Sequence, residues 1–137
     1  MKKLLPWVLR LVPAIILLQT LTFKFTAHPD SVALFAQLGV EPFGRIGIGV
    51  FELIAGILLL IPATSRFGAF LAVGLMLGAV ASHLFVLGIS YNGDGGALFG
   101  MALITLIAAA LIVYRERTQL ITDLNGLLGR KAVVAAK

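Results

Sequence analysis

Four apolar runs of membrane-spanning length constrain this chain more than any other feature. They cover approximately residues 4–25, 46–62, 67–89 and 97–114. A helix needs about 20 mostly apolar residues to cross a bilayer, and these runs do not alternate as the strands of a membrane β-barrel do. Only 12% of the 137 residues are charged, whereas soluble domains carry about 25%. The sequence therefore predicts an all-α integral membrane protein.

Lysine and arginine residues are divided unequally between the two sides of these runs. Lys24 and Arg45 lie on one side, and Arg10 lies within the first run. The other eight lie on the opposite side: Lys2, Lys3, Arg66, Arg115, Arg117, Arg130, Lys131 and Lys137. Because these residues concentrate on the cytoplasmic side of a membrane, we expect both termini to be cytoplasmic. The net charge of +5 suits anionic lipid, and we do not interpret it as nucleic-acid binding.

The segments between and after the runs predict two further helices. Residues 30–39 form a short apolar pattern that Asp30 or Ser31 could cap, which indicates a helix on the outer membrane face. After Tyr114, leucine and isoleucine recur along one helical face, as expected for an amphipathic helix. We therefore divide the chain into a transmembrane domain, residues 1–114, and a basic cytoplasmic tail, residues 115–137. The short connections predict an antiparallel four-helix bundle.

Small residues recur at four-residue intervals in the last two runs. Gly74, Gly78 and Ser82 share one helix face, and Gly96 and Gly100 repeat the spacing. Small residues let membrane helices approach closely, so we expect these five to pack helices together. The second run contributes further candidates, Gly47, Gly49 and Gly56. Glycine is also simply frequent in membrane helices.

Four polar side chains from three runs reach a similar depth near the outer face: Gln19, Lys24, Glu52 and His83. Glu52 lies about 10 Å below the start of its run, at about 1.5 Å per residue. An unpaired carboxylate is costly at that depth, so Glu52 should face the bundle and find a partner. Lys24 is the leading candidate, Arg45 the second and His83 the third. Two interpretations stay open: a ligand or proton site, or a polar tie in which Glu52 pairs with Lys24 and His83 donates to a backbone carbonyl.

Other chemistries find little support in the residues. The chain has no cysteine, which excludes disulfides, thiolate-bound clusters and a Cys-x-x-Cys redox motif. Glu52, His83 and the distant His28 lack the spacing of metal ligands, so no metal site is predicted. The turn containing Asn92 and Asp94 could bind a cation or substrate, or could be only a turn.

These residues resemble the DoxX family of small bacterial four-helix membrane proteins. The resemblance covers about residues 10–114. It rests on Gln19-Thr-Leu-Thr-Phe-Lys24-Phe25, Gly44-Arg-Ile-Gly47, Glu52-Leu-Ile-Ala, Ser82-His83-Leu84 and Asp94-Gly-Gly-Ala-Leu-Phe99. It implies a location in the bacterial cytoplasmic membrane. Some relatives are similar to subunits of a thiosulfate:quinone oxidoreductase, and others are linked to membrane complexes that handle thiol or oxidative stress.

Three functional hypotheses follow. The first is a redox-associated subunit that binds a quinone or a small acidic substrate near the outer face. Its pocket would use Gln19, Lys24, Glu52 and His83, supported by Arg45, Asn92 and Asp94. Such a subunit would hold no covalently bound cofactor and would depend on membrane or peripheral redox partners for any catalysis. The second is a proton-linked transporter, which at this size would need a homodimer. The third is a structural or assembly subunit, which a sealed and paired Glu52 would favour.

Overall fold

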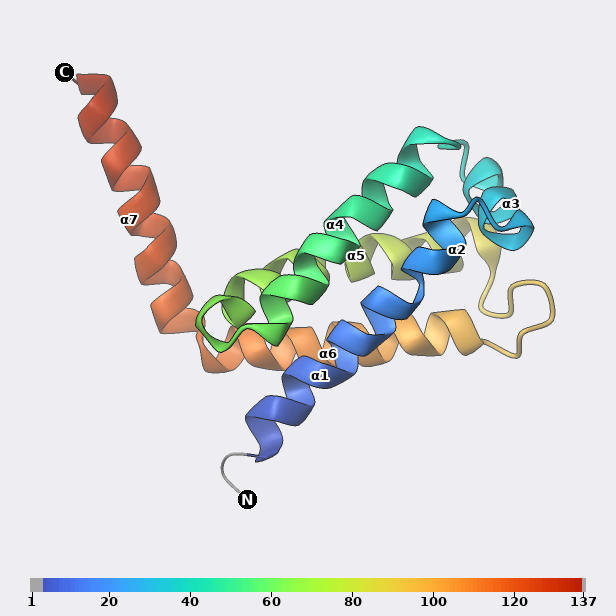
Figure 1. Ribbon diagram of the computed structural model, residues 1–137, viewed down its shortest axis with the longest axis horizontal. Helices are drawn as coiled ribbons and strands as arrows, with labels where there is room; N and C mark the ends of the chain where they lie inside the picture. The colour runs from blue at the N-terminus through green and yellow to red at the C-terminus, as the bar shows by residue number, and fades with distance from the viewer. Residues whose placement is uncertain (1–3, 137) are drawn as a thin grey trace.

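The computed structural model describes residues 4–136, the last seven of these by backbone only. Within that range the chain is helical and has no strand (Figure 1). The helices are α1 Leu4–Gln19, α2 Leu21–Phe25, α3 Pro29–Gln37, α4 Phe43–Leu60, α5 Ser65–Ser82, α6 Ala97–Arg115 and α7 Arg117–Ala136. A 3₁₀ turn, Pro62–Thr64, precedes α5, and a π-helical turn, His83–Leu87, follows it. Lys2, Lys3 and Lys137, used above to predict orientation, lie outside the described residues.

Four helical segments are long and apolar enough to cross a membrane: Leu4–Phe25, Phe43–Leu60, Pro62–Leu87 and Ala97–Arg115. The prediction of an all-helical chain with four membrane-length helices is therefore confirmed. The second segment begins three residues earlier than predicted, because the helix already starts at Phe43. A backbone in lipid must satisfy its own hydrogen bonds, and a helix does this within one segment.

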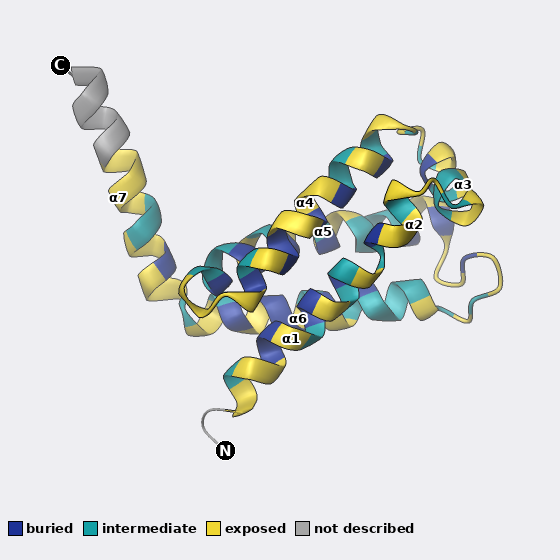
Figure 2. Ribbon diagram, viewed as in Figure 1, coloured by how far each residue is buried: buried dark blue, intermediate teal, exposed yellow. Residues whose placement is uncertain are grey.

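The four long helices pack around a shared centre, with α1 against α4 and α6, and α5 against the same two neighbours. We call α1, α4, α5 and α6 the four-helix core. Its interior consists mainly of alanine and leucine, including the fully buried Leu17 and Leu59. Large apolar side chains such as Ile15, Phe70 and Ile107 remain exposed. Figure 2 shows exposed residues alternating with buried ones along α1 and α4. An apolar interior inside an apolar exterior suits a lipid solvent, in which burial is not needed to shelter apolar groups.

Glycines of α4 and α5 permit close approach to another helix at three points. A Cβ on Gly68 would lie 2.7 Å from the Leu59 backbone nitrogen and 2.8 Å from the Ala55 carbonyl oxygen. A Cβ on Gly56 would meet the Leu18 side chain at 2.7 Å, and one on Gly49 would meet Phe25 at 2.8 Å. Gly68 therefore marks the tightest backbone contact, between α4 and α5.

The predicted small-residue stripe does not make such contacts within the chain. No heavy atom lies within 4 Å of a Cβ built on Gly74, Gly78 or Gly100, and Gly96 meets Ile89 only at ordinary contact distance, 3.5 Å. Ser82 donates to the Gly78 carbonyl of its own helix at 2.8 Å. The structure therefore corrects this prediction: α5 presents Ala69, Ala72 and Met76 to the core, and the stripe lies on another face.

Two helix boundaries also differ from the predictions. The first run is not one continuous helix but is interrupted at Thr20, between α1 and α2. The helix α3 begins at Pro29, and its cap is His28 rather than Asp30 or Ser31, because His28 Nδ1 accepts a hydrogen bond from the Asp30 backbone nitrogen at 3.2 Å. A histidine nitrogen can replace the usual side-chain oxygen at this position because the ring presents an acceptor to the same amide.

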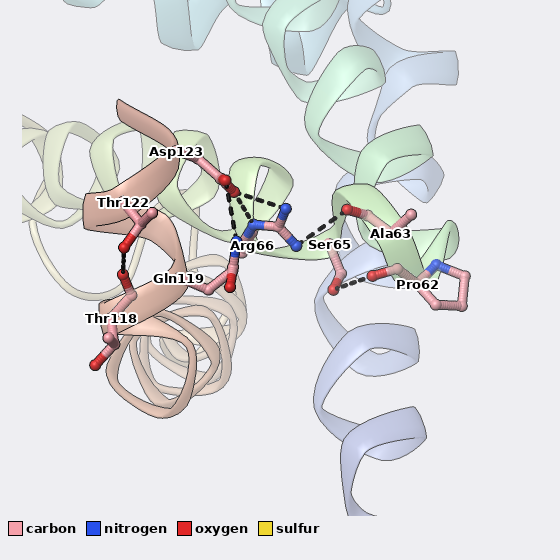
Figure 3. A network of polar contacts seen from close by, with 8 residues as sticks. All are labelled: Pro62, Ala63, Ser65, Arg66, Thr118, Gln119, Thr122 and Asp123. Atoms are coloured by element: carbon pink, nitrogen blue, oxygen red, sulfur yellow. Dashed lines mark hydrogen bonds and ion pairs between the residues drawn. The ribbon is translucent and has the colours of Figure 1, made fainter. Parts of the chain in front are cut away.

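The last helix, α7, leaves the core at the end of α6 and points away from it (Figure 1). One ion pair connects it to the start of α5, shown in Figure 3. Arg66 Nε donates to Asp123 Oδ2 at 2.7 Å, and Gln119 Nε2 donates to the other carboxylate oxygen at 3.1 Å. Leu120, on the same helix, is buried. The described part of the tail is therefore one helix, and it is longer than the leucine pattern alone indicated.

Candidate functional site

Glu52 lies in the middle of α4 and is nearly buried, with 7% of its side chain exposed. Lys24, in the last turn of α2, places its Nζ 2.9 Å from Glu52 Oε2. The Thr20 hydroxyl lies 3.3 Å from the same oxygen and also donates to the Leu17 carbonyl at 2.9 Å. Lys24 is therefore the partner of Glu52, as the sequence predicted. A charge-assisted bond of this length is the strong kind that a carboxylate inside a membrane segment requires.

Arg45 supports this pair without touching Glu52. Its Nε donates to both carboxylate oxygens of Glu41, at 2.8 and 3.0 Å. Its Nη1 donates to the backbone carbonyl of Lys24. The expectation that Arg45 could pair with Glu52 is therefore wrong, because its guanidinium faces Glu41 one turn back. Arg45 instead fixes the end of α2, and so it positions the lysine.

His83 and Gln19 lie apart from the ion pair. His83 is buried, its Nδ1 lies 3.0 Å from the Gly88 carbonyl oxygen, and its ring meets the edge of Phe99 at 5.7 Å between centroids. Gln19 is exposed, and its amide approaches Met101 Sδ at 3.2 Å. The four-residue polar layer is therefore divided, and only Lys24 and Glu52 meet. A common depth along the membrane normal does not fix the direction in which a side chain points around its helix.

Thr20 is the contact that the sequence reasoning missed. A lone threonine in an apolar helix is unremarkable by itself, because its hydroxyl commonly bonds to its own helix backbone. The useful signal was its spacing, since Thr20 precedes Lys24 by four residues and residues so spaced share a helix face.

In the turn before α6, the Asp94 carboxylate accepts hydrogen bonds from backbone amides of the turn and of the first turn of the helix. Its Oδ1 accepts from the Gly96 backbone nitrogen at 2.8 Å and from Tyr91 at 3.1 Å, and its Oδ2 accepts from Leu98 at 3.2 Å. These backbone donors, Gly96 first and Leu98 next, hold the pKa of Asp94 below its usual range. Asn92 adopts a positive φ of 53° in the same turn. Both carboxylate oxygens of Asp94 therefore bond to the backbone of this segment, as expected if the segment is only a turn.

The arrangement defines a limited chemistry. Among residues 4–136, no three His, Asp or Glu side chains gather as metal ligands would. What the site offers is an ammonium and a carboxylate in contact, held by a threonine hydroxyl and an anchored backbone carbonyl. The Lys24 ammonium could release the Glu52 carboxylate and bind another hydrogen-bond acceptor in its place. Alternatively, the pair could simply tie α2 to α4.

The chain has four membrane-length helices and a buried lysine–glutamate pair between them. These features define the class: a small membrane protein with several helices. The family model described as the DoxX-like family matches residues 8–113, so this chain belongs to the DoxX-like family. The match confirms the resemblance drawn from the motifs. Comparisons with curated proteins and with solved structures found no match.

Proposed function

We propose that this chain is a non-catalytic membrane subunit that binds a quinone or a small acidic substrate at Lys24, beside redox partners. It lies in the bacterial cytoplasmic membrane as an antiparallel four-helix bundle with both termini in the cytoplasm. In this arrangement α3 lies on the outer membrane face and α7 on the cytoplasmic surface. The distribution of Lys and Arg supports this orientation, and DoxX-like membership supports the class.

The buried pair of Lys24 and Glu52 is the observation that carries the proposal. The ammonium already donates to one carboxylate oxygen, and a quinone carbonyl or a substrate carboxylate offers the same kind of acceptor. Lys24 is the more accessible partner, with 13% of its side chain exposed against 7% for Glu52. An incoming ligand therefore reaches the lysine first and displaces Glu52, which takes up a proton as it leaves.

Electron transfer in such a complex is assigned to the quinone and to partner subunits. The chain has no cysteine to carry a redox disulfide or a thiolate-bound cluster. Its own contribution is to bind the ligand, to orient one of its oxygens at Lys24, and to exchange one proton at Glu52.

A structural role is the second candidate, and a specific observation favours it. Glu52 has two partners, Lys24 and Thr20, and Arg45 bonds to the Lys24 backbone, so the charges are satisfied within the chain. In that case the pair only ties α2 to α4. The transporter hypothesis requires a relay between Glu52 and His83, whereas His83 contacts Gly88 and Phe99.

The test compares ligand retention with stability in wild type, Lys24→Gln and Glu52→Gln. Each full chain is purified in detergent, extracted for mass spectrometry, and titrated with a short-tailed benzoquinone and with succinate. We expect Lys24→Gln to lose retention, whereas Glu52→Gln keeps or increases it because the competing carboxylate is gone. Arg117→Gln, on the exposed start of α7, is the charge control. If both site variants lower the unfolding temperature and no variant retains a ligand, the structural role is correct and the binding proposal is wrong.

A further inference from the structure

A cavity with charged side chains in a mostly apolar lining lies at the end of the four-helix core where α1 begins and α6 ends; we call this the basal end. Its volume is about 370 Å³, within the range of small-molecule sites. Arg10, Ser65, Arg115 and Glu116 line it. The other lining residues are apolar: Pro6, Leu9, Pro62 and Ile112. Three charged groups from α1 and the end of α6 thus surround one small space.

These charges do not satisfy one another. Arg10 is 7% exposed, its Nε donates to the Pro6 carbonyl at 3.3 Å, and its guanidinium lies 3.9 Å from the centre of the Trp7 ring. No carboxylate pairs with it among the described residues. Glu116 Oε2 is buried and has no hydrogen-bond partner within the described part of the chain. An unsatisfied buried carboxylate oxygen is costly, which points to a donor supplied from outside the chain.

The neighbouring groups do not supply that donor. Ser65 uses its hydroxyl on the Pro62 carbonyl at 3.1 Å, and the nearby Arg66 is engaged by Asp123, as Figure 3 shows. The cavity is therefore lined by two cationic residues, Arg10 and Arg115, and by Glu116, whose carboxylate has one oxygen, Oε2, without a donor among the described residues.

An apolar groove adjoins this cavity on the surface between α1 and α6. Its volume is about 230 Å³, and its walls include Val8 and Val12 from α1 with Ile104 and Leu111 from α6. Leu9 lines both hollows, so the two spaces are neighbours.

We propose that the basal end binds one phospholipid whose headgroup carries both a phosphate and a primary ammonium. The phosphate lies on Arg10 and Arg115, the ammonium donates to the Glu116 carboxylate, and an acyl chain follows the groove between α1 and α6. A phosphate alone would match the arginines but would leave Glu116 beside a negative charge. A quaternary ammonium has no N–H to donate. The primary ammonium is the headgroup cation that satisfies the carboxylate oxygen.

The experiment measures lipid preference by native mass spectrometry. The full chain is purified in detergent, freed of endogenous lipid, and mixed with equal amounts of phosphatidylethanolamine, phosphatidylglycerol and phosphatidylcholine. We expect wild type to retain phosphatidylethanolamine in preference to the other two. Glu116→Gln should lower that preference about tenfold, the size of one charge-assisted hydrogen bond. Arg115→Gln should weaken retention of all three lipids, because all carry the phosphate.

Matched controls keep the result specific. Asp30→Asn removes an acid outside the cavity, and Arg117→Gln removes an exposed arginine whose guanidinium lies over Tyr114. Both should retain the wild-type preference. Arg115 is exposed, so its replacement tests the phosphate contact even if Arg10→Gln fails to fold. Equal retention of the three lipids by wild type, no retention of any, or an unchanged preference in folded Glu116→Gln would overturn the proposal.

Discussion

Glu52 and Glu116 are two carboxylates in a chain with few charges, and their surroundings differ in one respect. Glu52 Oε2 has Lys24 at 2.9 Å and Thr20 at 3.3 Å. Glu116 Oε2 is buried without a hydrogen-bond partner among the described residues, although Arg10 lines the same cavity. Burial alone therefore does not show whether a carboxylate already has a partner within the chain. The distinction is whether the chain itself brings an opposite charge into contact.

The cause lies in how each cation is held. Lys24 is carried on a short separate helix, α2, whose end Arg45 fixes through the Lys24 carbonyl. Arg10 instead turns toward its own helix, onto Trp7 and the Pro6 carbonyl. The first pair is formed inside the chain, so a ligand there must displace Glu52, whereas the second set of charges borders an open space. The following predictions test this contrast, beginning with the largest expected effect.

Lys24→Met should destabilise the protein by roughly 3 kcal/mol, because it leaves Glu52 as an uncompensated charge. The measurement is denaturant unfolding in detergent, followed by circular dichroism. Adding Glu52→Leu to the same chain should recover most of the loss, because an apolar pair replaces the ionic one. An equal loss in the single and double variants would show that Glu52 is not the group that needs Lys24.

Gly68→Ala tests the contact between α4 and α5. Both carboxylate sites depend on the position of α4, because α4 carries Glu52 and leads into Pro62 at the basal cavity. The added Cβ would meet backbone atoms of Leu59 and Ala55 below 3.0 Å, which cannot move away cheaply. We expect a loss of about 1–3 kcal/mol in the same unfolding assay. Gly74→Ala is the control, because its Cβ meets nothing within 4 Å. It should be neutral or stabilising by up to about 1 kcal/mol, and equal losses in both variants would contradict the assignment.

Glu116→Gln tests the other side of the contrast. In lipid-free detergent it should change the free energy of unfolding by less than about 1 kcal/mol, with a neutral or stabilising sign, because it removes a charge that lacks a partner. Glu52→Gln should be destabilising in the same assay, because it removes half of a formed ion pair. The two substitutions are chemically identical, so the same sign for both would show that the surroundings of the two carboxylates do not differ in energy.

Asp94 should give the smallest effect, and that effect should disappear in acid. Backbone hydrogen bonds lower its pKa in the folded state, so its contribution is present above the ordinary aspartate pKa of about 3.9. That contribution is lost as the pH falls from this value through the lowered native pKa. Asp94→Asn should therefore differ from wild type in unfolding temperature at neutral pH and converge with it in acid. Asp30→Asn is the matched control, and a difference that stayed constant with pH would rule out Asp94 as the titrating group.

The sequence by itself determined the local features of this protein. It predicted the four membrane-length segments, because a helix in lipid must be apolar along its whole length. It also predicted Lys24 as the partner of Glu52, because few cations lie at that depth, and it predicted the family through short motifs confirmed over residues 8–113.

Only the tertiary structure decided which side of each helix meets a neighbour. It turned His83 toward Gly88, Gln19 toward Met101 and Arg45 toward Glu41, and it left the stripe that includes Gly74 and Gly78 outside the core contacts. It also brought Arg10 and Glu116 to one cavity from distant parts of the chain. Residue spacing fixes height along a helix and relative angle around it. The rotation of each helix is set by packing against the others, and that rotation decides whether a buried charge meets a partner or a cavity.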